Sequence, residues 1–223
     1  CRVPLGILSE GLTPETLAAA FAQSAAVPGE DIPALEDRLA VLMGLIREGT
    51  LPFDPAAAAA EIAAWRAAGF PACHHSEDYR NAYHPAYRVL HKRYAHLLPL
   101  LAAIDRALGS KPRMLLAIEG GSASGKSTLA ELLTGIYPDA ALFHADDYFL
   151  RPEQRTPERF AQPGGNMDRE RLEAEVLAPL RRGEAAVYRP FDCGTMTLRP
   201  PVTVRPARLN IVEGAYSLHP SLE

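Results

Sequence analysis

The chain has 223 residues, of which 48% are apolar and 22% are charged, and its formal net charge is -4. This composition excludes a largely disordered chain, because so many apolar residues are enough to bury a core. No apolar run reaches the roughly 20 residues of a membrane-spanning helix, and the acidic balance argues against nucleic acid as a partner. Three scattered cysteines do not make a disulfide framework, so we expect a cytoplasmic protein.

The first 110 residues carry the signals of helices. Thr13 and Asp54 each precede a proline, which is the signature of a capped helix start, and Asp31 caps a further helix. The expected helices cover residues 14–24, 31–49, 56–69 and, after Pro85, 86–108. We therefore predict an all-α N-terminal region over residues 1–110, whose role the sequence does not reveal.

The pattern changes at residue 111, where short apolar runs begin to alternate with helical segments. Buried strands are expected at residues 114–118, 141–143 and 209–212. A helix is expected over residues 168–180, and a β-hairpin or extended excursion over residues 186–204. Such alternation predicts a parallel α/β sheet, which we assign to a second domain at residues 111–223.

A glycine-rich motif follows the first predicted strand and precedes a helix. It reads G-x-x-x-x-G-K-S and consists of Gly120, Gly121, Ser122, Ala123, Ser124, Gly125, Lys126 and Ser127, with Thr128 next. Backbone N–H groups of such a loop surround a phosphate, a catalytic lysine reaches the β- and γ-phosphates, and the serine hydroxyl binds Mg²⁺. The motif predicts a P-loop NTPase fold, with Lys126 and Ser127 at a nucleotide site.

Acidic residues follow two of the other predicted strands. Asp146 and Asp147 lie just beyond the second strand, and Glu213 ends the third. Carboxyl ends of parallel strands meet at one edge of a sheet, where ligands bind. Acids opposite a P-loop suit phosphoryl transfer to an alcohol, since one carboxylate accepts the hydroxyl proton and another serves the metal. Asp146 and Asp147 are both candidates for the base.

Residues 114–220 resemble the uridine kinase family, whose relatives include phosphoribulokinase, pantothenate kinase and nicotinamide riboside kinase. The P-loop sequence at residues 120–128 is similar to that of the family, and residues 146–149 are similar to its acidic-aromatic motif. Further similar segments lie at residues 166–168, 190–192 and 211–214.

The resemblance implies an ATP- and Mg²⁺-dependent kinase with a small-molecule acceptor. It implies Asp146 as the general base and Ser127 with Glu213 at the Mg²⁺ site. It also implies substrate-binding residues, namely Tyr148, Asp168, Phe191 and Asp192. Considered without the resemblance, Asp168 is better explained as an acid at a helix N-terminus, and with the resemblance the two interpretations are equally supported.

This sequence departs from the family pattern on the acceptor side. Phe191 stands where the family has tyrosine, and residues 193–196 contain no histidine where the family places one that reads the base. We therefore expect a nucleoside or nucleoside-like acceptor whose identity the sequence does not specify. The alternative is a nucleotide-binding regulatory module without acceptor kinase activity. Assembly into a homo-oligomer is left open.

The second domain is short for a sheet of this family. Only ten residues follow Glu213, and members of the family carry further strands and an arginine-bearing lid beyond that glutamate. We therefore expect the P-loop sheet to be incomplete, lacking its lid and last strands, and the 223 residues to be part of a longer protein.

Histidines and tyrosines gather between residues 73 and 96. Their spacing matches no strong zinc pattern, and Pro85 interrupts any single helical face. A structural or surface role is therefore favoured for the histidines over a zinc site. His84, Tyr79, Tyr83 and Tyr87 are alternatively expected to line an accessory surface over the active site, for which core packing is the simpler explanation.

Overall fold

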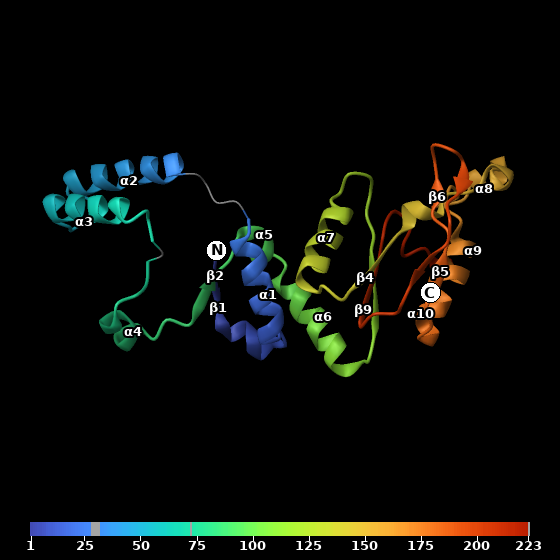
Figure 1. Ribbon diagram of the computed structural model, residues 1–223, viewed down its shortest axis with the longest axis horizontal. Helices are drawn as coiled ribbons and strands as arrows, with labels where there is room; N and C mark the ends of the chain where they lie inside the picture. Colours follow the sequence, from blue (N-terminus) through green and yellow to red (C-terminus); the bar gives the residue numbers. More distant parts are fainter. Residues whose placement is uncertain (28–31, 72, 223) are drawn as a thin grey trace.

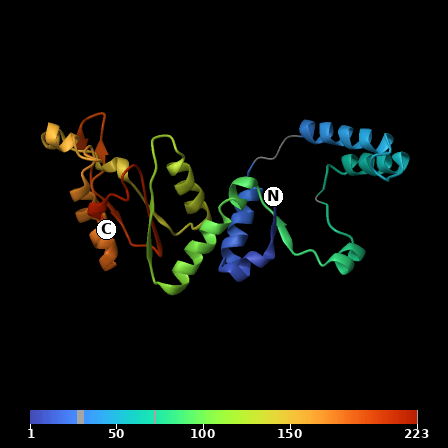
Figure 2. The same cartoon turned by 180° about the vertical axis from the view of Figure 1, so that it is seen from behind.

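The computed structural model describes residues 1–27, 32–71 and 73–222, and the predicted cap Asp31 lies outside them. The molecule is elongated, with helices α2 and α3 at one end and α8, α9 and α10 at the other (Figures 1 and 2). None of the described helices is long and apolar enough to cross a membrane.

The first half is mainly helical, as expected. Its elements are β1 (Arg2–Pro4), η1 (Leu5–Glu10), α1 (Pro14–Ala25), α2 (Ile32–Arg47), α3 (Pro55–Ala67), α4 (Glu77–Tyr83), β2 (Tyr87–Val89), α5 (Lys92–Ala95) and α6 (Leu98–Ser110). The side chains of Thr13 and Asp54 accept hydrogen bonds at the starts of α1 and α3, which confirms both predicted caps.

The second half alternates strands and helices. Its elements are β3 (Met114–Ile118), α7 (Lys126–Ile136), β4 (Ala141–His144), η2 (Ala145–Tyr148), η3 (Pro152–Gln154), α8 (Pro157–Phe160), α9 (Arg169–Leu172), η4 (Glu173–Leu177), α10 (Ala178–Arg182), β5 (Ala186–Tyr188), β6 (Phe191–Asp192), β7 (Thr197–Leu198), β8 (Val202–Val204), β9 (Leu209–Glu213) and η5 (Pro220–Leu222). The predicted excursion at residues 186–204 forms two antiparallel pairs, β5 with β8 and β6 with β7.

The expected α/β class is confirmed by a parallel sheet in the order β3-β9-β4. Met114 pairs with Leu209, and Ala141 pairs with Asn210. Every residue of the central strand β9 is buried, including the polar Asn210 and Glu213 as well as the apolar Leu209, Ile211 and Val212. At the carboxyl edge, Glu213 stands between Ile118 of β3 and His144 of β4.

Two predictions about the first half are wrong. The region is not all-α, because Arg2 of β1 pairs with Val89 of β2 in a short antiparallel ladder. The expected helix over residues 86–108 is instead strand β2 followed by α5 and α6. Three-residue strands are too short to show a periodic pattern, and their pairing joins segments far apart in the sequence.

The main core joins the helical half to the sheet. Buried side chains of α1, α6 and α7 pack together with those of β3 and β9. Within this contact, the buried carboxylate of Asp105 on α6 accepts hydrogen bonds from the backbone N–H and the hydroxyl of Thr13, the hydroxyl of Thr16 and that of Tyr137. Burial raises the pKa of Tyr137 above its ordinary value, and the hydrogen bond to Asp105 raises it further.

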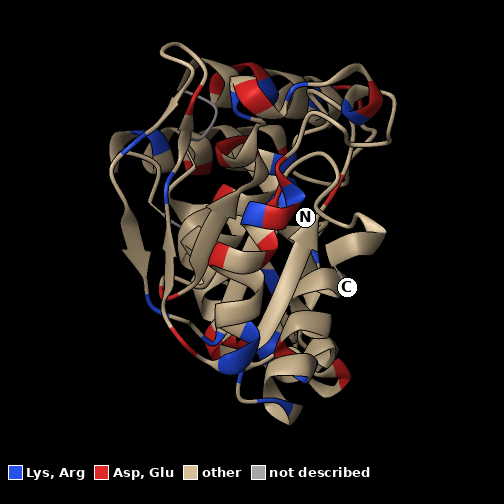
Figure 3. Cartoon of the chain, turned by 90° about the vertical axis from the view of Figure 1, so that its right-hand side faces the viewer, with Lys and Arg blue, Asp and Glu red and all other residues tan. Residues whose placement is uncertain are grey.

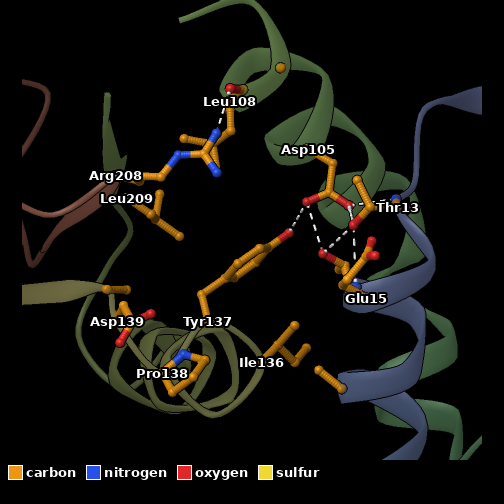
Figure 4. Close-up of a pocket in the computed structure, with 14 residues that line it drawn as sticks. Thr13, Glu15, Asp105, Leu108, Ile136, Tyr137, Pro138, Asp139, Arg208 and Leu209 are labelled. Atoms are coloured by element: carbon orange, nitrogen blue, oxygen red, sulfur yellow. Dashed lines mark hydrogen bonds between the residues drawn. The ribbon is translucent and has the colours of Figure 1, made fainter. Parts of the chain in front are cut away.

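Figure 4 shows this network beside a cavity of about 630 Å³ at the amino edge of the sheet. Tyr137 points toward Asp105, and Arg208 donates to the carbonyl oxygen of Leu108 at 2.8 Å. Because ligands of open α/β sheets bind at the carboxyl edge, this cavity is separate from the site predicted above.

The end of the molecule that holds α8, α9 and α10 has a second hydrophobic core (Figure 1). Phe143 and Tyr148 pack there with Leu172 and Val176 of the helical segment that follows Asp168. Acidic and basic residues are interspersed over this end, as Figure 3 shows, and they form surface ion pairs such as Arg181 with Glu173 at 2.6 Å.

Candidate functional site

The P-loop occupies the turn between β3 and α7. Gly125 adopts a φ of 89° immediately before the helix, and Ala123 a φ of 58°. A Cβ at Gly120 would lie 2.7 Å from Ser124 Oγ, so a larger residue there would require the serine side chain to shift. Lys126 Nζ donates to the carbonyl oxygen of Gly121 at 2.9 Å. The lysine is therefore folded back over the loop that it is predicted to serve.

Glu213 connects the P-loop to the end of the sheet. Its carboxylate, on a residue 5% exposed, accepts from Ser127 Oγ at 3.3 Å to each oxygen. His144 Nδ1 lies 2.7 Å from Glu213 Oε1. Strand pairing thus brings together two residues that were predicted as Mg²⁺ ligands, and adds a histidine that sequence reasoning missed.

The chain beyond Glu213 is tightly constrained. A Cβ at Gly214 would lie 2.4 Å from the Cβ of Ala145, so glycine lets β9 pass close to η2. The carboxylate of Glu119 accepts from the backbone N–H of Leu218 at 2.7 Å, which gives Glu119 a structural role. These contacts fix the segments on both sides of the Ser127–Glu213 contact.

The two candidate bases lie on η2, directly after β4. Asp146 is exposed, and Asp147 is partly buried. Burial raises the pKa of Asp147, while the nearby positive charges of His144, Arg199 and Arg171 act in the opposite direction. Both carboxylates follow the strand that pairs with β9, at the edge that holds Glu213.

Asp168 is 2% exposed and is engaged inside the protein. It caps α9, since its Oδ1 accepts from the backbone N–H of Arg171 at 3.2 Å. Its Oδ2 accepts from Gln154 Nε2 at 3.0 Å and lies 3.4 Å from Arg171 Nε. Arg171 also donates to the carbonyl oxygens of Asp147 and Arg189, at 2.8 and 2.5 Å. Asp168 thereby supports two segments of the predicted acceptor side.

The other predicted acceptor-side residues are held by similar contacts. Tyr148 is fully buried, with its ring 5.8 Å from that of Tyr188. Phe191 is buried beneath the guanidinium of Arg155. Asp192 accepts from the backbone N–H groups of the following turn and from Arg199, and these hydrogen bonds lower its pKa.

The predicted residues therefore fall into two groups. Ser127 and Glu213 touch each other, whereas Asp168, Asp192 and Phe191 each contact other neighbours. Among the described residues, no group of three or more histidines, cysteines and acids could hold a metal ion. One hydroxyl and one carboxylate are nevertheless the oxygen donors that Mg²⁺ uses when substrate phosphates and water complete its shell.

Sequence reasoning missed three polar residues of this region: His144, Gln154 and Arg171. The signal for His144 was available, because it directly follows a predicted strand and lies two residues before Asp146. Gln154 and Arg171 lie in a loop and a helix, and only the folded chain brings them to Asp168.

No protein-family model and no curated protein matches this chain. Among solved structures, it is similar to a possible uridine kinase from Bacillus stearothermophilus, with 25% identity and a TM-score of 0.42, over 53% of this chain and 72% of that one. It is also similar to a candidate fructose transport system kinase from Silicibacter sp. TM1040, with 26% identity and a TM-score of 0.42, over 52% of this chain and 62% of that one.

Proposed function

We propose that the chain is an ATP-dependent phosphotransferase that transfers the γ-phosphoryl group to a hydroxyl of a nucleoside or nucleoside-like metabolite. The observation that carries the proposal is the contact between Ser127 of the P-loop helix and Glu213 of β9, beside the strand that leads into Asp146 and Asp147. It supports a phosphate site, a metal site and an acceptor base at one edge of the sheet.

The P-loop holds the phosphates in this proposal. Backbone N–H groups at the start of α7 surround an anion, and the helix dipole favours it. Lys126 exchanges its hydrogen bond with the Gly121 carbonyl for the β- and γ-phosphates, which neutralises charge that develops during transfer.

Ser127 and Glu213 would hold Mg²⁺. Both provide hard oxygen donors, and His144 orients the carboxylate through its 2.7 Å contact. When bound, the metal would offset negative charge on the β- and γ-phosphate oxygens.

Asp146 accepts the proton of the acceptor hydroxyl, and Asp147 remains the alternative base. Asp146 is exposed, so its carboxylate is free to contact the hydroxyl of an incoming acceptor. Asp168, Asp192, Phe191 and Tyr148 shape the acceptor side. Asp168 and Tyr148 are buried, which favours a role in supporting the wall of the acceptor site over direct contact with the acceptor.

An acceptor screen tests the proposal. ADP formation from ATP and Mg²⁺ is measured with nucleosides, pantothenate and pentose phosphates, and ATP binding is measured in parallel. We expect acceptor-dependent turnover for at least one hydroxyl compound. Tight ATP binding without turnover for any of them would support the regulatory module, in which the helical half transmits the nucleotide-bound state to a partner.

Matched variants then assign the base. Asp146→Asn is expected to lower kcat at least about 100-fold while the Kd for ATP stays within about twofold. Asp147→Asn is the control at the neighbouring position. If Asp147→Asn abolishes turnover and Asp146→Asn does not, the base assignment is reversed. Lys126→Ala is expected to weaken ATP binding itself.

A further inference from the structure

A second pocket lies between helix α4 and strand β2. Its volume is about 480 Å³, and it is lined by His75, Arg80, His84, Pro85, Tyr87 and Arg88. Helix α4 and strand β2 lie on the opposite side of α1 from the P-loop helix α7 (Figures 1 and 2). The pocket is therefore separate from the nucleotide site proposed above.

The lining of this pocket is basic although the chain as a whole is acidic. Two arginines and two histidines line it, and no acidic residue does. Within the described part of the chain, neither Arg80 nor Arg88 forms an ion pair, although Arg88 donates to the carbonyl oxygen of Tyr87 at 3.1 Å. A third guanidinium, that of Arg2, stands 5.1 Å from the centre of the Tyr87 ring. Arg80 and Arg88 are both exposed, so water screens much of the repulsion between them, and a bound anion would offset the positive charge of the lining.

Aromatic contacts hold one wall of the pocket in place. The ring of His75 stacks on Tyr79 with centroids 4.4 Å apart and planes 17° apart. His75 Nε2 lies 2.6 Å from the hydroxyl of Tyr87, which fixes the orientation of the imidazole. His84 ends α4 with a φ of 42°, directly before Pro85. These constraints reduce the ordering that a ligand would otherwise have to impose.

We propose that this pocket binds the phosphate group of a small phosphorylated metabolite. Guanidinium groups match phosphate oxygens in bidentate geometry, and the two histidines of the lining are further polar groups at the pocket. The volume exceeds what a lone anion fills and lies in the range of small-molecule sites, so a sugar-sized body can follow the phosphate. The site does not depend on the proposed kinase activity.

Binding to the chain of 223 residues tests the proposal. Lys126→Ala is introduced first, so that the P-loop does not compete for the probe, which is ribose 5-phosphate. Calorimetry is expected to give a Kd on the order of 1 mM, because the pocket is open to water. Adding Arg80→Ala and Arg88→Ala should weaken binding at least tenfold. Arg47→Ala, an exposed arginine on α2, is the matched control and should leave the Kd unchanged.

Three further measurements make the outcome decisive. Circular dichroism establishes that the arginine variants fold, and Arg80→Glu alone should also abolish binding. Side-chain NMR signals of His75 and His84 should shift saturably with the probe. The proposal is overturned if these signals do not shift, if ribose binds as well as its phosphate, or if Arg47→Ala weakens binding equally. Preferential binding of a DNA oligonucleotide at these residues would overturn it as well.

Discussion

Asp105→Ala is the substitution that most directly tests how the two halves are joined. Asp105 is 7% exposed, and its carboxylate accepts from four donors: two groups of Thr13, which caps α1, the hydroxyl of Thr16 on α1, and that of Tyr137, which follows α7. Alanine removes the acceptor and leaves these donors behind. Leaving a buried donor unpaired costs about 1–3 kcal/mol each.

The structure limits how many donors are stranded. The hydroxyl of Thr13 also donates to Thr16 Oγ1 at 2.9 Å, and that of Tyr137 also reaches the carbonyl oxygen of Leu101 at 3.4 Å. The backbone N–H of Thr13 and the hydroxyl of Thr16 lose the acceptor that the carboxylate provided. We therefore expect a loss of about 4 kcal/mol in the free energy of unfolding, or about 8–16 °C in Tm for a chain of this size.

Chemical denaturation followed by circular dichroism measures this loss. Asp139→Ala is the control, because Asp139 lines the same cavity but is exposed, and its change should stay within about 0.5 kcal/mol. Adding Tyr137→Phe to Asp105→Ala should cost less than Tyr137→Phe alone, since the two groups share a hydrogen bond. A loss below about 1 kcal/mol for Asp105→Ala would refute the reasoning.

Two further predictions concern single side chains. The buried hydroxyl of Tyr148 has no hydrogen-bond partner within the part of the chain that the structure describes, so Tyr148→Phe should leave stability unchanged or raise it by up to about 1 kcal/mol; a clear loss in thermal unfolding would contradict this. Arg159 lowers the pKa of Glu170 from 4.5 to about 2, so this pair stabilises the fold above pH 4.5, and its contribution is lost as the pH falls through about 2. Because Glu170 is 65% exposed, Glu170→Gln should cost only about 0.5 kcal/mol at pH 7 and nothing below pH 2, and equal stability of the two proteins at pH 7 would argue against the pair.

The sequence predicted the elements whose signals are local. Prolines after capping residues located the starts of α1 and α3, and continuous apolar runs located β3, β4 and β9. Similarly, the P-loop follows from its glycines and from its place between a strand and a helix.

Features that depend on contacts between distant segments were not predictable. Pairing of β1 with β2 needs residues that lie far apart in the chain, and neither strand is long enough to show a pattern. His144 acquires its contact with Glu213 only because β4 and β9 become neighbours. Asp168 illustrates the same limit, since its position before a helix indicated a cap, whereas its bonds to Gln154 and Arg171 arise from the folded loop. The roles assigned to the site residues, and the boundary near residue 110, stay predictions.

The strand order β3-β9-β4 also constrains how the protein is made. Among the described residues, strands β3 and β4 have no ladder between them, and each pairs only with β9, which is the last of the three to leave the ribosome. The P-loop and the acidic pair are therefore translated well before the strand that aligns them. Until residues 209–213 emerge, two apolar strand edges stay unpaired, which exposes the nascent chain to aggregation and slows its folding.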